Sequence, residues 1–335
     1  MDSKESMLEI QNLHVVYKTD LETVYAVNGL TFSLQKGQTL GLVGETGAGK
    51  TTLALTIMGL LPERTGKVTQ GAVRFEGEDL IHLSEKNMRH VRGNKIAMIF
   101  QDPMTSLNPV LTVGEQIAEA LIVHNEAGLT KAEIDARVDE TLRMVGIPPA
   151  RKNEYPHQFS GGMKQRVVIA IALACNPQLL IADEPTTALD VTIQAQVLQL
   201  MNNLKKELNT SMILITHDLG VVAETCENVA IMYAGEIVEM GTLEDIYNHG
   251  CHPYTKGLFG SIPDLDVEQD RLTPISGLMP DPSALPTGCN FAPRCPYRTD
   301  ACEAAPIANY QLSPTHCARC IRVKKQAIKA EGGEG

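Results

Sequence analysis

The sequence predicts an α/β protein with a mostly parallel β-sheet in its main domain and a small, loop-rich domain at its C-terminal end. Several apolar runs of strand length end in polar residues, as strands do at the ligand-binding edge of a parallel sheet. One of these runs leads into a glycine-rich loop and an apolar helix. The tail from residue 251 onward holds six of the eight Cys and ten of the eighteen Pro, which places a domain boundary near residue 250.

The composition fits a folded protein of two domains, which we expect over residues 1–250 and 251–335. Hydrophobic residues make up 43% of the chain and charged residues 21%, as is ordinary for a soluble fold. The formal net charge of −11 argues against nucleic acid or an anionic membrane surface as the main partner. No signal peptide is visible, and the longest strongly apolar run is about half a membrane span. We therefore expect an intracellular chain that reaches a membrane only through a partner.

The strongest signal is a phosphate-binding loop that follows the apolar strand predicted at residues 40–43. The loop, GETGAGKTT, matches G-x-x-x-x-G-K-[ST] in the strand–loop–helix context that this motif requires. Backbone N–H groups of such a loop converge on phosphates, and the N-terminus of the following helix adds positive charge. We expect Lys50 to neutralise the β- and γ-phosphates of a nucleoside triphosphate, and the Thr51 hydroxyl to bind Mg²⁺. The predicted nucleotide contacts are Gly44, Glu45, Thr46, Gly47, Ala48, Gly49, Lys50, Thr51 and Thr52.

A second predicted strand, residues 179–182, is followed by Asp183 and Glu184. Its continuous apolar run is typical of a central parallel strand buried on both faces, and ligands bind at the C-terminal ends of such strands. We expect Asp183 to hold Mg²⁺ through water and Glu184 to polarise the water that attacks the γ-phosphate. The alternative, a helix N-cap followed by a charge in the first helical turn, is disfavoured beside a phosphate loop.

Two further apolar runs end in polar side chains that could reach the same phosphate. Gln101 follows the run KIAMIF and is also a candidate Mg²⁺ ligand, while His217 follows the run SMILIT. A lone His after a strand is usually structural or solvated, but the position of His217 parallels that of Asp183. Because parallel strands end at one edge of a sheet, we expect these residues and the loop to form one active site.

Together with these residues, the run FSGGM at residues 159–163 resembles the signature motif of the ATPase subunits of ABC transporters. That signature reads LSGGQ, so the first and last positions depart from it. Ser160 is a good N-cap, and Gly161 and Gly162 permit close backbone approach, which makes the motif a second anion site in one chain. The resemblance implies that these three residues and Met163 contact the γ-phosphate bound to a partner subunit, so that two ATP molecules are sandwiched head to tail.

The same resemblance assigns roles to two residues outside the loop and the signature. An aromatic residue upstream of the phosphate loop is expected to stack on adenine. Tyr17 is the favoured candidate, and Tyr25 is its competitor. Asp190 is expected to lie across the dimer interface and to organise the partner's site.

Ahead of the signature, the pattern of the chain becomes helical. Two capping boxes, Thr112 with Glu115 and Thr130 with Glu133, predict the starts of two helices. This insertion, about residues 103–165, resembles the helical subdomain of ABC ATPases, which docks onto the cytoplasmic coupling helices of membrane subunits. It has no long heptad run of the kind found in relatives that carry coiled-coil arms. The resemblance also implies a P-loop NTPase core with an antiparallel β portion near the N-terminus.

Two stretches narrow the resemblance to importers of di- and oligopeptides: FQDPMTSLNPVLTVGEQI and, after the ATPase core, HPYTKGLFGSIP. The implied function is ATP hydrolysis that powers peptide uptake. The implied partners are two transmembrane permease subunits, a paralogous ATP-binding subunit and, indirectly, an external substrate-binding protein. The implied location is peripheral, on the cytoplasmic face of the inner membrane. The alternatives are the ATPase of a nickel or glutathione importer, a soluble ABC ATPase acting on a cytosolic machine, and a subunit that binds ATP without turnover.

The implied reaction is in-line attack of water on the γ-phosphate of ATP. Glu184 would act as the base, with Gln101 and His217 as positioning groups. Lys50 and Mg²⁺ would take up the charge that develops on the phosphate oxygens. ATP binding would close the dimer, and hydrolysis would release it.

The clustered thiols of the tail are a candidate metal centre rather than a disulfide framework, because the implied ATPase works in a reducing cytosol. Four Cys thiolates suit a structural Zn²⁺ or an iron–sulfur cluster, but only Cys317 and Cys320 have the close spacing that zinc sites favour. The resemblance implies a four-iron, four-sulfur (4Fe-4S) cluster, with the expected ligands Cys289, Cys295, Cys302 and Cys320. The fourth ligand of the subfamily follows a His by four residues, which selects Cys320 after His316. Cys317 is then a spare or alternative ligand, and Zn²⁺ or unligated thiols are the alternatives to the cluster.

Overall fold

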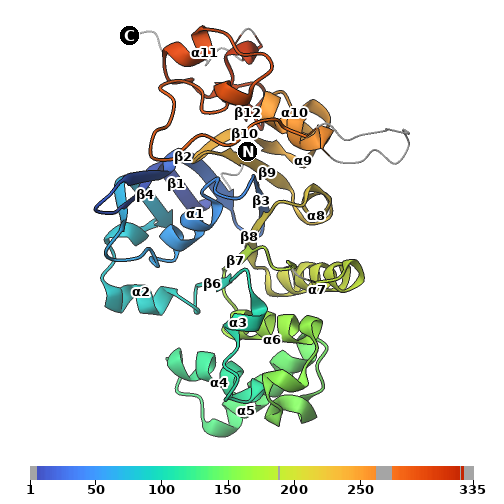
Figure 1. The fold of residues 1–335 in the computed structure, drawn as a ribbon. Helices are drawn as coiled ribbons and strands as arrows, with labels where there is room; N and C mark the ends of the chain where they lie inside the picture. The colour runs from blue at the N-terminus through green and yellow to red at the C-terminus, as the bar shows by residue number, and fades with distance from the viewer. Residues whose placement is uncertain (1–5, 188, 262–273, 325, 328–335) are drawn as a thin grey trace.

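A computed structural model describes residues 6–187, 189–261, 274–324 and 326–327. Figure 1 shows two β-sheets in the middle of the molecule, a helical subdomain at the bottom and the C-terminal region at the top.

The first sheet is antiparallel and lies near the N-terminus, as expected. Its strands are β1 (Ser6–Lys18), β2 (Thr23–Gln35), β4 (Gly66–Phe75) and β5 (Glu78–Asp79). They pair in the order β2-β1-β4-β5. Leu8, Ile10 and Val15 on β1 are fully buried, so this sheet presents an apolar face to the main sheet.

The main sheet has eight strands in the order β11-β12-β10-β9-β3-β8-β7-β6. These strands are β3 (Thr39–Val43), β6 (Ile96–Ile99), β7 (Leu179–Asp183), β8 (Ser211–Thr216), β9 (Asn228–Tyr233), β10 (Glu236–Thr242), β11 (Tyr310–Gln311) and β12 (Cys317–Ala318). The run from β9 through β3, β8 and β7 to β6 is parallel, and β10, β11 and β12 are antiparallel. The C-terminal region therefore extends the same sheet that carries the phosphate loop.

Apolar residues of the central strands alternate between the two faces of the main sheet. Ile181 and Ile213 belong to the core cluster on the side of the antiparallel sheet, whereas Leu180 and Leu214 belong to the cluster on the helical side. Both faces are covered, which explains why these strands are apolar without interruption. The helices of the main domain outside the helical subdomain are α1 (Lys50–Ile57), α2 (Glu85–Val91), α7 (Val191–Leu208), α8 (Leu219–Thr225) and α9 (Leu243–His249).

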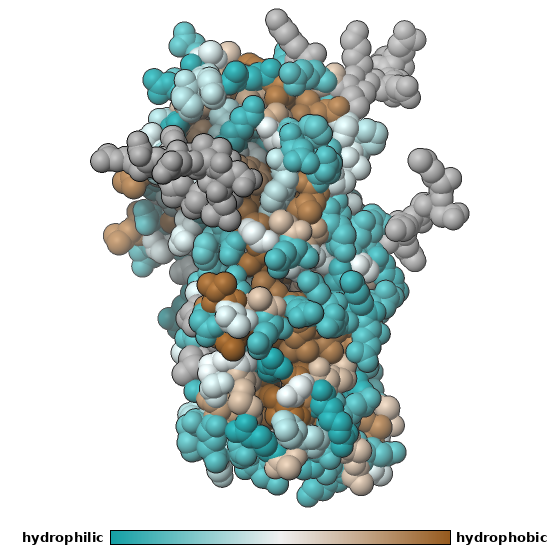
Figure 2. All heavy atoms as spheres, turned by 90° about the vertical axis from the view of Figure 1, so that its right-hand side faces the viewer, coloured by the Kyte–Doolittle hydropathy of each residue, from teal (hydrophilic) through white to brown (hydrophobic). Residues whose placement is uncertain are grey.

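The helical subdomain is inserted between the neighbouring strands β6 and β7. Its helices are α3 (Pro103–Ser106), α4 (Val113–Val123), α5 (Lys131–Met144) and α6 (Gly161–Leu173). The predicted capping boxes at Thr112 and Thr130 are confirmed, with Glu115 and Glu133 closing them. Figure 2 shows hydrophobic side chains reaching the surface at the height of this subdomain, whose exposed apolar residues include Ile122.

The C-terminal region has little regular structure among its described residues. Its helices are α10 (Pro253–Gly260) and α11 (Ala301–Ala304). The short 3-10 helices of the chain are Leu80–His82, Pro149–Asn153, Pro156–Gln158, Ala292–Arg294 and Ile321–Val323. Because a region of this kind has few core residues of its own, it depends on its contacts with the main sheet.

Candidate active site

The loop between β3 and α1 needs glycine for steric reasons. Gly47 and Gly49 have φ of 85° and 99°, in the left-handed region that glycine favours. A Cβ at Gly44 would lie 2.1 Å from the carbonyl oxygen of Met232, and one at Gly49 would lie 2.2 Å from that of Ala26. The loop is thus pressed against the backbone of its neighbours, and its shape is fixed by contacts that no side chain could share.

Lys50 is the first residue of α1, and its side chain folds back into the loop. Nζ donates hydrogen bonds to the carbonyl oxygens of Gly44 at 2.6 Å and Glu45 at 3.0 Å. Burial lowers the pKa of Lys50, and the carboxylates of Glu184 and Asp183 oppose this effect. A cation held only by carbonyl groups can exchange them for phosphate oxygens.

Thr51 and Asp183 meet at the place where the sequence predicts a magnesium site. The Thr51 hydroxyl donates a hydrogen bond of 2.7 Å to Asp183 Oδ2. Burial raises the pKa of Asp183, against the opposing effect of the Thr51 hydrogen bond and the Lys50 charge. A hydroxyl beside a carboxylate is the oxygen donor set that Mg²⁺ prefers, so these two residues fit the ion.

Glu184 follows β7 in a strained backbone conformation. Its φ of 46° lies in the left-handed region, which is unusual for a residue with a side chain. Its N–H donates to the carbonyl oxygen of Ile215 at 2.8 Å, which ties this turn to β8. This conformation directs the carboxylate away from the strand and toward the neighbouring strand ends.

Three polar side chains surround the carboxylate of Glu184. Gln101 Nε2 donates to Oε2 at 3.0 Å and the Thr187 hydroxyl donates to the same oxygen at 2.9 Å. His217 Nδ1 lies 3.3 Å from Oε1. Burial raises the pKa of Glu184, but the Thr187 hydrogen bond, the His217 contact and the Lys50 charge outweigh it, so the pKa is lowered. The structure thus brings Gln101 and His217 to Glu184, and it adds Thr187, which the sequence analysis missed.

Tyr17 and Tyr25 differ in their relation to the loop. The Tyr17 hydroxyl donates to Thr52 Oγ1 at 3.3 Å, so this ring lies beside the start of α1. Tyr25 is 45% exposed on β2, and its N–H donates to the carbonyl oxygen of Pro282. Of the two candidates for adenine stacking, Tyr17 is therefore the one in direct contact with a predicted nucleotide-binding residue.

The signature residues lie at the N-terminus of α6, in the helical subdomain and apart from α1 (Figure 1). Ser160 caps this helix and accepts a hydrogen bond from the Met163 N–H at 3.4 Å. Asp190 caps α7 in the same way, accepting from the Ile193 N–H at 3.0 Å. Ser160, Gly161 and Asp190 are exposed. The two helix N-termini are neighbours, because a Cβ on Gly162 would lie 2.5 Å from Cγ2 of Ile193.

Four Cys of the C-terminal region line one small cavity, together with Phe291 and Arg322. The four are Cys289, Cys295, Cys302 and Cys320. Cys317 lies instead on β12, opposite Met240 of β10. Burial raises the pKa of Cys289 to about 11. All eight Cys are free.

The thiols that line this cavity are not close-packed. Within the described residues, the one group of three or more potential ligands whose atoms lie within 4.8 Å of one another is Glu239, Cys251 and His316. No three of the four thiols therefore come as close as that. In a tetrahedral zinc site the sulfurs would lie about 3.8 Å apart, given Zn–S bonds of about 2.3 Å. The spacing is wider than a single zinc ion would impose.

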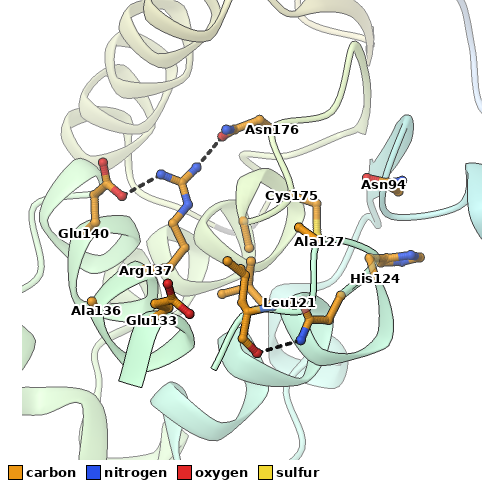
Figure 3. A pocket seen from close by; sticks show the side chains of 13 residues that line it. Asn94, Leu121, His124, Ala127, Glu133, Ala136, Arg137, Glu140, Cys175 and Asn176 are labelled. Atoms are coloured by element: carbon orange, nitrogen blue, oxygen red, sulfur yellow. Dashed lines mark hydrogen bonds and ion pairs between the residues drawn. The ribbon is translucent and has the colours of Figure 1, made fainter. Parts of the chain in front are cut away.

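A further cavity lies between the helical subdomain and the N-terminal ends of β6 and β7 (Figure 3). Its most prominent charged side chain is Arg137, which pairs with Glu140 at 2.6 Å and donates to Asn176 Oδ1 at 2.6 Å. This cavity lies at the opposite edge of the sheet from Gln101 and Glu184. It is not part of the candidate active site.

Comparisons with known proteins agree with this geometry. The family model described as ABC transporter matches residues 27–187, and the model described as oligopeptide/dipeptide transporter, C-terminal region, matches residues 238–302. The chain is 52% identical over 318 residues to the dipeptide transport ATP-binding protein DppD of Bacillus subtilis, covering 94% of each chain. It is 49% identical over 333 residues to the oligopeptide transport ATP-binding protein OppD of the same organism, covering 98% of this chain and 92% of the relative.

Solved structures show the same fold over the main domain. A dimeric ATP-binding cassette in a post-hydrolysis state, bound to ADP and Pi, aligns with a TM-score of 0.64 and 30% identity, covering 71% of this chain and 99% of that chain. The cbiO1 protein of Clostridium perfringens, part of the ABC transporter complex cbiONQ, aligns with a TM-score of 0.63 and 29% identity. It covers 73% of this chain and 91% of that chain.

Proposed function

The chain belongs to the family of ATP-binding subunits of ABC peptide transporters, and we propose that it powers the import of di- and oligopeptides through a membrane complex. The observation that carries the cargo assignment is the match of residues 238–302 to the C-terminal region of oligopeptide and dipeptide transporters. Many transporters with different cargoes share the same ATPase domain, so that domain alone does not identify a cargo. The C-terminal region is the part of the chain that indicates a peptide transporter.

As a member of this family the chain is an ATPase, and its residues suggest how it hydrolyses ATP. Glu184 accepts a proton from the attacking water, a role that needs an ionised carboxylate, and its lowered pKa keeps it ionised at neutral pH. Gln101 and His217 hold this carboxylate from two sides and orient the water. When bound, Mg²⁺ neutralises charge on the β- and γ-phosphates. Thr51 and Asp183 are the residues that would hold it.

Lys50 supplies the charge of the loop to the phosphates. On ATP binding its ammonium group leaves the carbonyl oxygens of Gly44 and Glu45 and pairs with phosphate oxygens. The cation is already desolvated inside the loop, so this exchange requires little further loss of hydration. Because water is excluded from the loop, the charge of Lys50 stabilises the negative charge of the transition state more strongly than it would in bulk water.

The signature residues serve a second ATP-binding subunit, which we propose to be a paralogue. The exposed N-terminus of α6 carries Ser160 and two glycines, and it lies apart from the chain's own phosphate loop (Figure 1). A helix N-terminus of this kind binds anions. In a head-to-tail pair, Ser160 to Met163 would meet the γ-phosphate on the partner, with Asp190 beside them.

The four thiols of the C-terminal cavity are proposed to hold a 4Fe-4S cluster, with Zn²⁺ as the alternative. The cavity is lined by Cys289, Cys295, Cys302 and Cys320. The donor set suits either group, and no three of the four sulfurs lie within 4.8 Å of one another, which supports the larger group. A bound cluster would cross-link segments of a region that has few core residues of its own.

We place the subunit at the cytoplasmic face of the membrane, bound to two permease subunits. No helix of the described residues is long and apolar enough to span a membrane. The helical subdomain exposes Val110, Ile122 and Val123, which are 59–75% exposed, and such apolar surface supports docking of a permease segment there. Substrate selection would then lie with the permeases and an external binding protein.

Peptide uptake by cells that lack this chain tests the cargo assignment. Cells supplied with the wild-type chain should take up labelled di- and oligopeptides, and cells supplied with an equally expressed Lys50→Met chain should not. Uptake of nickel or glutathione, but not of peptides, would replace the cargo with that of a related importer. If the wild-type chain restored no uptake and no permease subunits co-purified with it, a soluble ABC ATPase acting on a cytosolic machine would be favoured.

A further inference from the structure

Glu45, the second residue of the phosphate loop, is contacted by two residues of the C-terminal region. The Glu45 N–H donates a hydrogen bond of 3.0 Å to the hydroxyl oxygen of Tyr254 on α10. Arg294 pairs with the Glu45 carboxylate, with 2.8 Å between NH1 and Oε2. The carbonyl oxygen of Glu45 accepts a hydrogen bond from Lys50. One loop residue is therefore fixed by the C-terminal region on its amide and side chain and by the catalytic lysine on its carbonyl.

Both contacting residues are buried and well supported. Tyr254 is fully buried and packs against Tyr233 and Phe291, with ring centroids 4.6 and 5.4 Å away. The Arg294 side chain is 6% exposed and also donates to the carbonyl oxygens of Ile275 and Ser276. A buried, multiply bonded arginine contributes more than a surface ion pair, whose partners are solvated and mobile.

The C-terminal region touches the outside of the loop at a further point. A Cβ on Gly47 would lie 2.9 Å from Cε of Met279, so this methionine closes the space next to the loop's left-handed turn. Pro282, three residues later, accepts a hydrogen bond from the Tyr25 N–H of β2. Residues 279 and 294 of the C-terminal region thus contact the loop at Gly47 and Glu45, and Pro282 contacts the neighbouring strand β2.

The contact with Glu45 is not required to attach the C-terminal region to the rest of the protein. That attachment has its own anchor, the buried carboxylate of Glu239 on β10, which accepts hydrogen bonds from the N–H groups of Cys251 and His252 and contacts His316. The pairing of β12 with β10 adds to it. The Tyr254 and Arg294 contacts therefore need another reason, and their common target is the phosphate loop.

We propose that Tyr254 and Arg294 are positioning residues of the nucleotide site, which hold Glu45 so that the loop keeps its phosphate-binding shape when Lys50 leaves it. Lys50 must give up the carbonyl of Glu45 to reach the phosphates, and the loop then loses an internal constraint. The C-terminal contacts remain and keep the peptide group of Glu45 in place. The loop is thereby preorganised, and ATP binding does not have to order it. This inference rests on the proposed role of the loop in ATP binding.

The test is ATP binding and steady-state hydrolysis by the full chain with Tyr254→Phe and Arg294→Met. Each change should raise the Kd and KM for Mg-ATP about three- to tenfold, the effect of losing one buried hydrogen bond or ion-pair contact, and leave kcat within about twofold. Arg294→Lys should recover part of the loss. The matched control is Arg319→Met, which removes a paired arginine from the same region whose partner, 2.8 Å away, is Glu236 on β10 and not Glu45.

A double variant separates positioning from general stability. If Arg294 acts through Glu45, Arg294→Met combined with Glu45→Ala should raise KM no more than either change alone, because both remove the same contact. An unchanged KM in both Tyr254→Phe and Arg294→Met would overturn the inference. A lower kcat at unchanged KM would also overturn it, because that result indicates only a smaller fraction of folded protein. Tyr254→Phe removes a single oxygen and keeps the ring that packs against Tyr233 and Phe291, so we expect it to fold. A wild-type chain that bound no ATP would instead contradict the proposed site itself.

Discussion

Glu184 combines strain, partial burial and three hydrogen-bonding neighbours in one residue. Its φ of 46° is the conformation that turns the carboxylate toward Gln101, Thr187 and His217. Such strain persists only where surrounding contacts maintain it, and here the bond from its N–H to the carbonyl of Ile215 does so. At the scale of single residues, the backbone strain, the burial and the hydrogen bonds therefore all act on the proposed base, Glu184.

Glu184→Gln is expected to reduce ATP turnover by a factor of 100 or more, because the amide cannot accept the proton of the attacking water. The Kd for ATP should change by less than about threefold, since Lys50 and the loop are intact. Turnover by chromatographic detection of ADP and binding by fluorescent ATP measure the two effects. Glu224→Gln, the same change at an exposed position of α8, is the control. Multiple turnover by Glu184→Gln at a near wild-type rate would remove Glu184 from the role of base.

Cys320 and Cys317 provide a second contrast between single residues. Cys320 lines the cavity of the four thiols, whereas Cys317 pairs through its backbone on β12. Cys320→Ser is expected to lose most of the iron and acid-labile sulfide, and Cys317→Ser to keep about four of each per chain, in protein purified without oxygen. Loss of iron only in Cys317→Ser would reverse the ligand assignment. One zinc without sulfide in the wild type would replace the cluster with a single metal ion.

At the scale of elements, the N-termini of α6 and α7 form one unit. Ser160 and Asp190 cap these helices, and the glycine at position 162 brings them together. The arrangement presents two capped helix ends and the exposed carboxylate of Asp190 on one surface. It is the packing between the helices, rather than either cap, that sets their relative position.

Gly162→Ala is expected to displace one of these helix ends, because its Cβ would lie 2.5 Å from Cγ2 of Ile193. Overpacking of this kind costs about 1–3 kcal/mol, so ATP turnover in the assembled transporter should fall about fivefold or more. Ile193→Ala removes the obstructing atoms and should restore part of the activity in the double variant. If the double variant were no better than Gly162→Ala, the steric explanation would fail. The Kd for ATP of the isolated chain serves as the control and should not change.

At the scale of the whole molecule, Glu239 joins the C-terminal region to the main sheet. This fully buried carboxylate accepts hydrogen bonds from the Cys251 and His252 N–H groups, and His316 Nε2 lies 2.8 Å from it. Burial alone would raise the pKa of Glu239, but the contact with His316 and the hydrogen bonds from Cys251 lower it to about 2. One ionised side chain on β10 is therefore bonded to the start of the C-terminal region at Cys251 and His252 and to His316, 77 residues away.

Glu239→Gln is expected to lower the free energy of unfolding at pH 7 by roughly 3 kcal/mol, from a pKa shift of about two and a half units. Because the folded pKa is depressed, this stabilisation is present above pH 4.5 and is lost as the pH falls toward 2. The Tm of the wild type should thus fall over that range more steeply than that of the variant. Thermal unfolding between pH 7 and 3 measures both effects.

Glu236→Gln is the matched control for this prediction, since Glu236 lies on the same strand and pairs with Arg319. Burial raises the pKa of Glu236, against the effect of Arg319, so its ionised form gains no net stability from folding at neutral pH. Glu236→Gln should therefore lower the Tm less than Glu239→Gln does. Equal losses in both variants would show that the hydrogen-bond network around Glu239 has no special role.

The sequence predicts much of the site because local spacing specifies much of it. The loop motif, the polar residues after three apolar strands, and the capping boxes at Thr112 and Thr130 are short-range patterns. Each of these patterns predicts a particular local structure. The structure confirms the capping boxes and the antiparallel N-terminal portion. It also gathers Gln101 and His217 around Glu184, although the roles of these residues stay predictions.

The residues that sequence analysis missed take part in contacts without a spacing rule. Arg294 lies 249 positions from Glu45, and His316 lies 77 positions from Glu239. Thr187 is only three residues from Glu184, but its hydrogen bond to the Glu184 carboxylate depends on the turn after β7, which the sequence pattern does not specify. An aromatic or an arginine in a Pro-rich tail carries no local signal of its partner.

The phosphate loop, the strand ends and the helical insertion could be read from the amino-acid sequence, because each depends on interactions between residues close in the chain. The contacts of Tyr254 and Arg294 with the loop, and of Glu239 with the C-terminal region, appear only in the tertiary structure, which also shows Cys320, the residue already favoured by its spacing from His316, lining the cavity of the thiols. The pairing of β12 with β10 holds the C-terminal region against the main sheet, beside strands that come much earlier in the chain. Chain distance then no longer predicts distance in space, and burial fixes which partners meet.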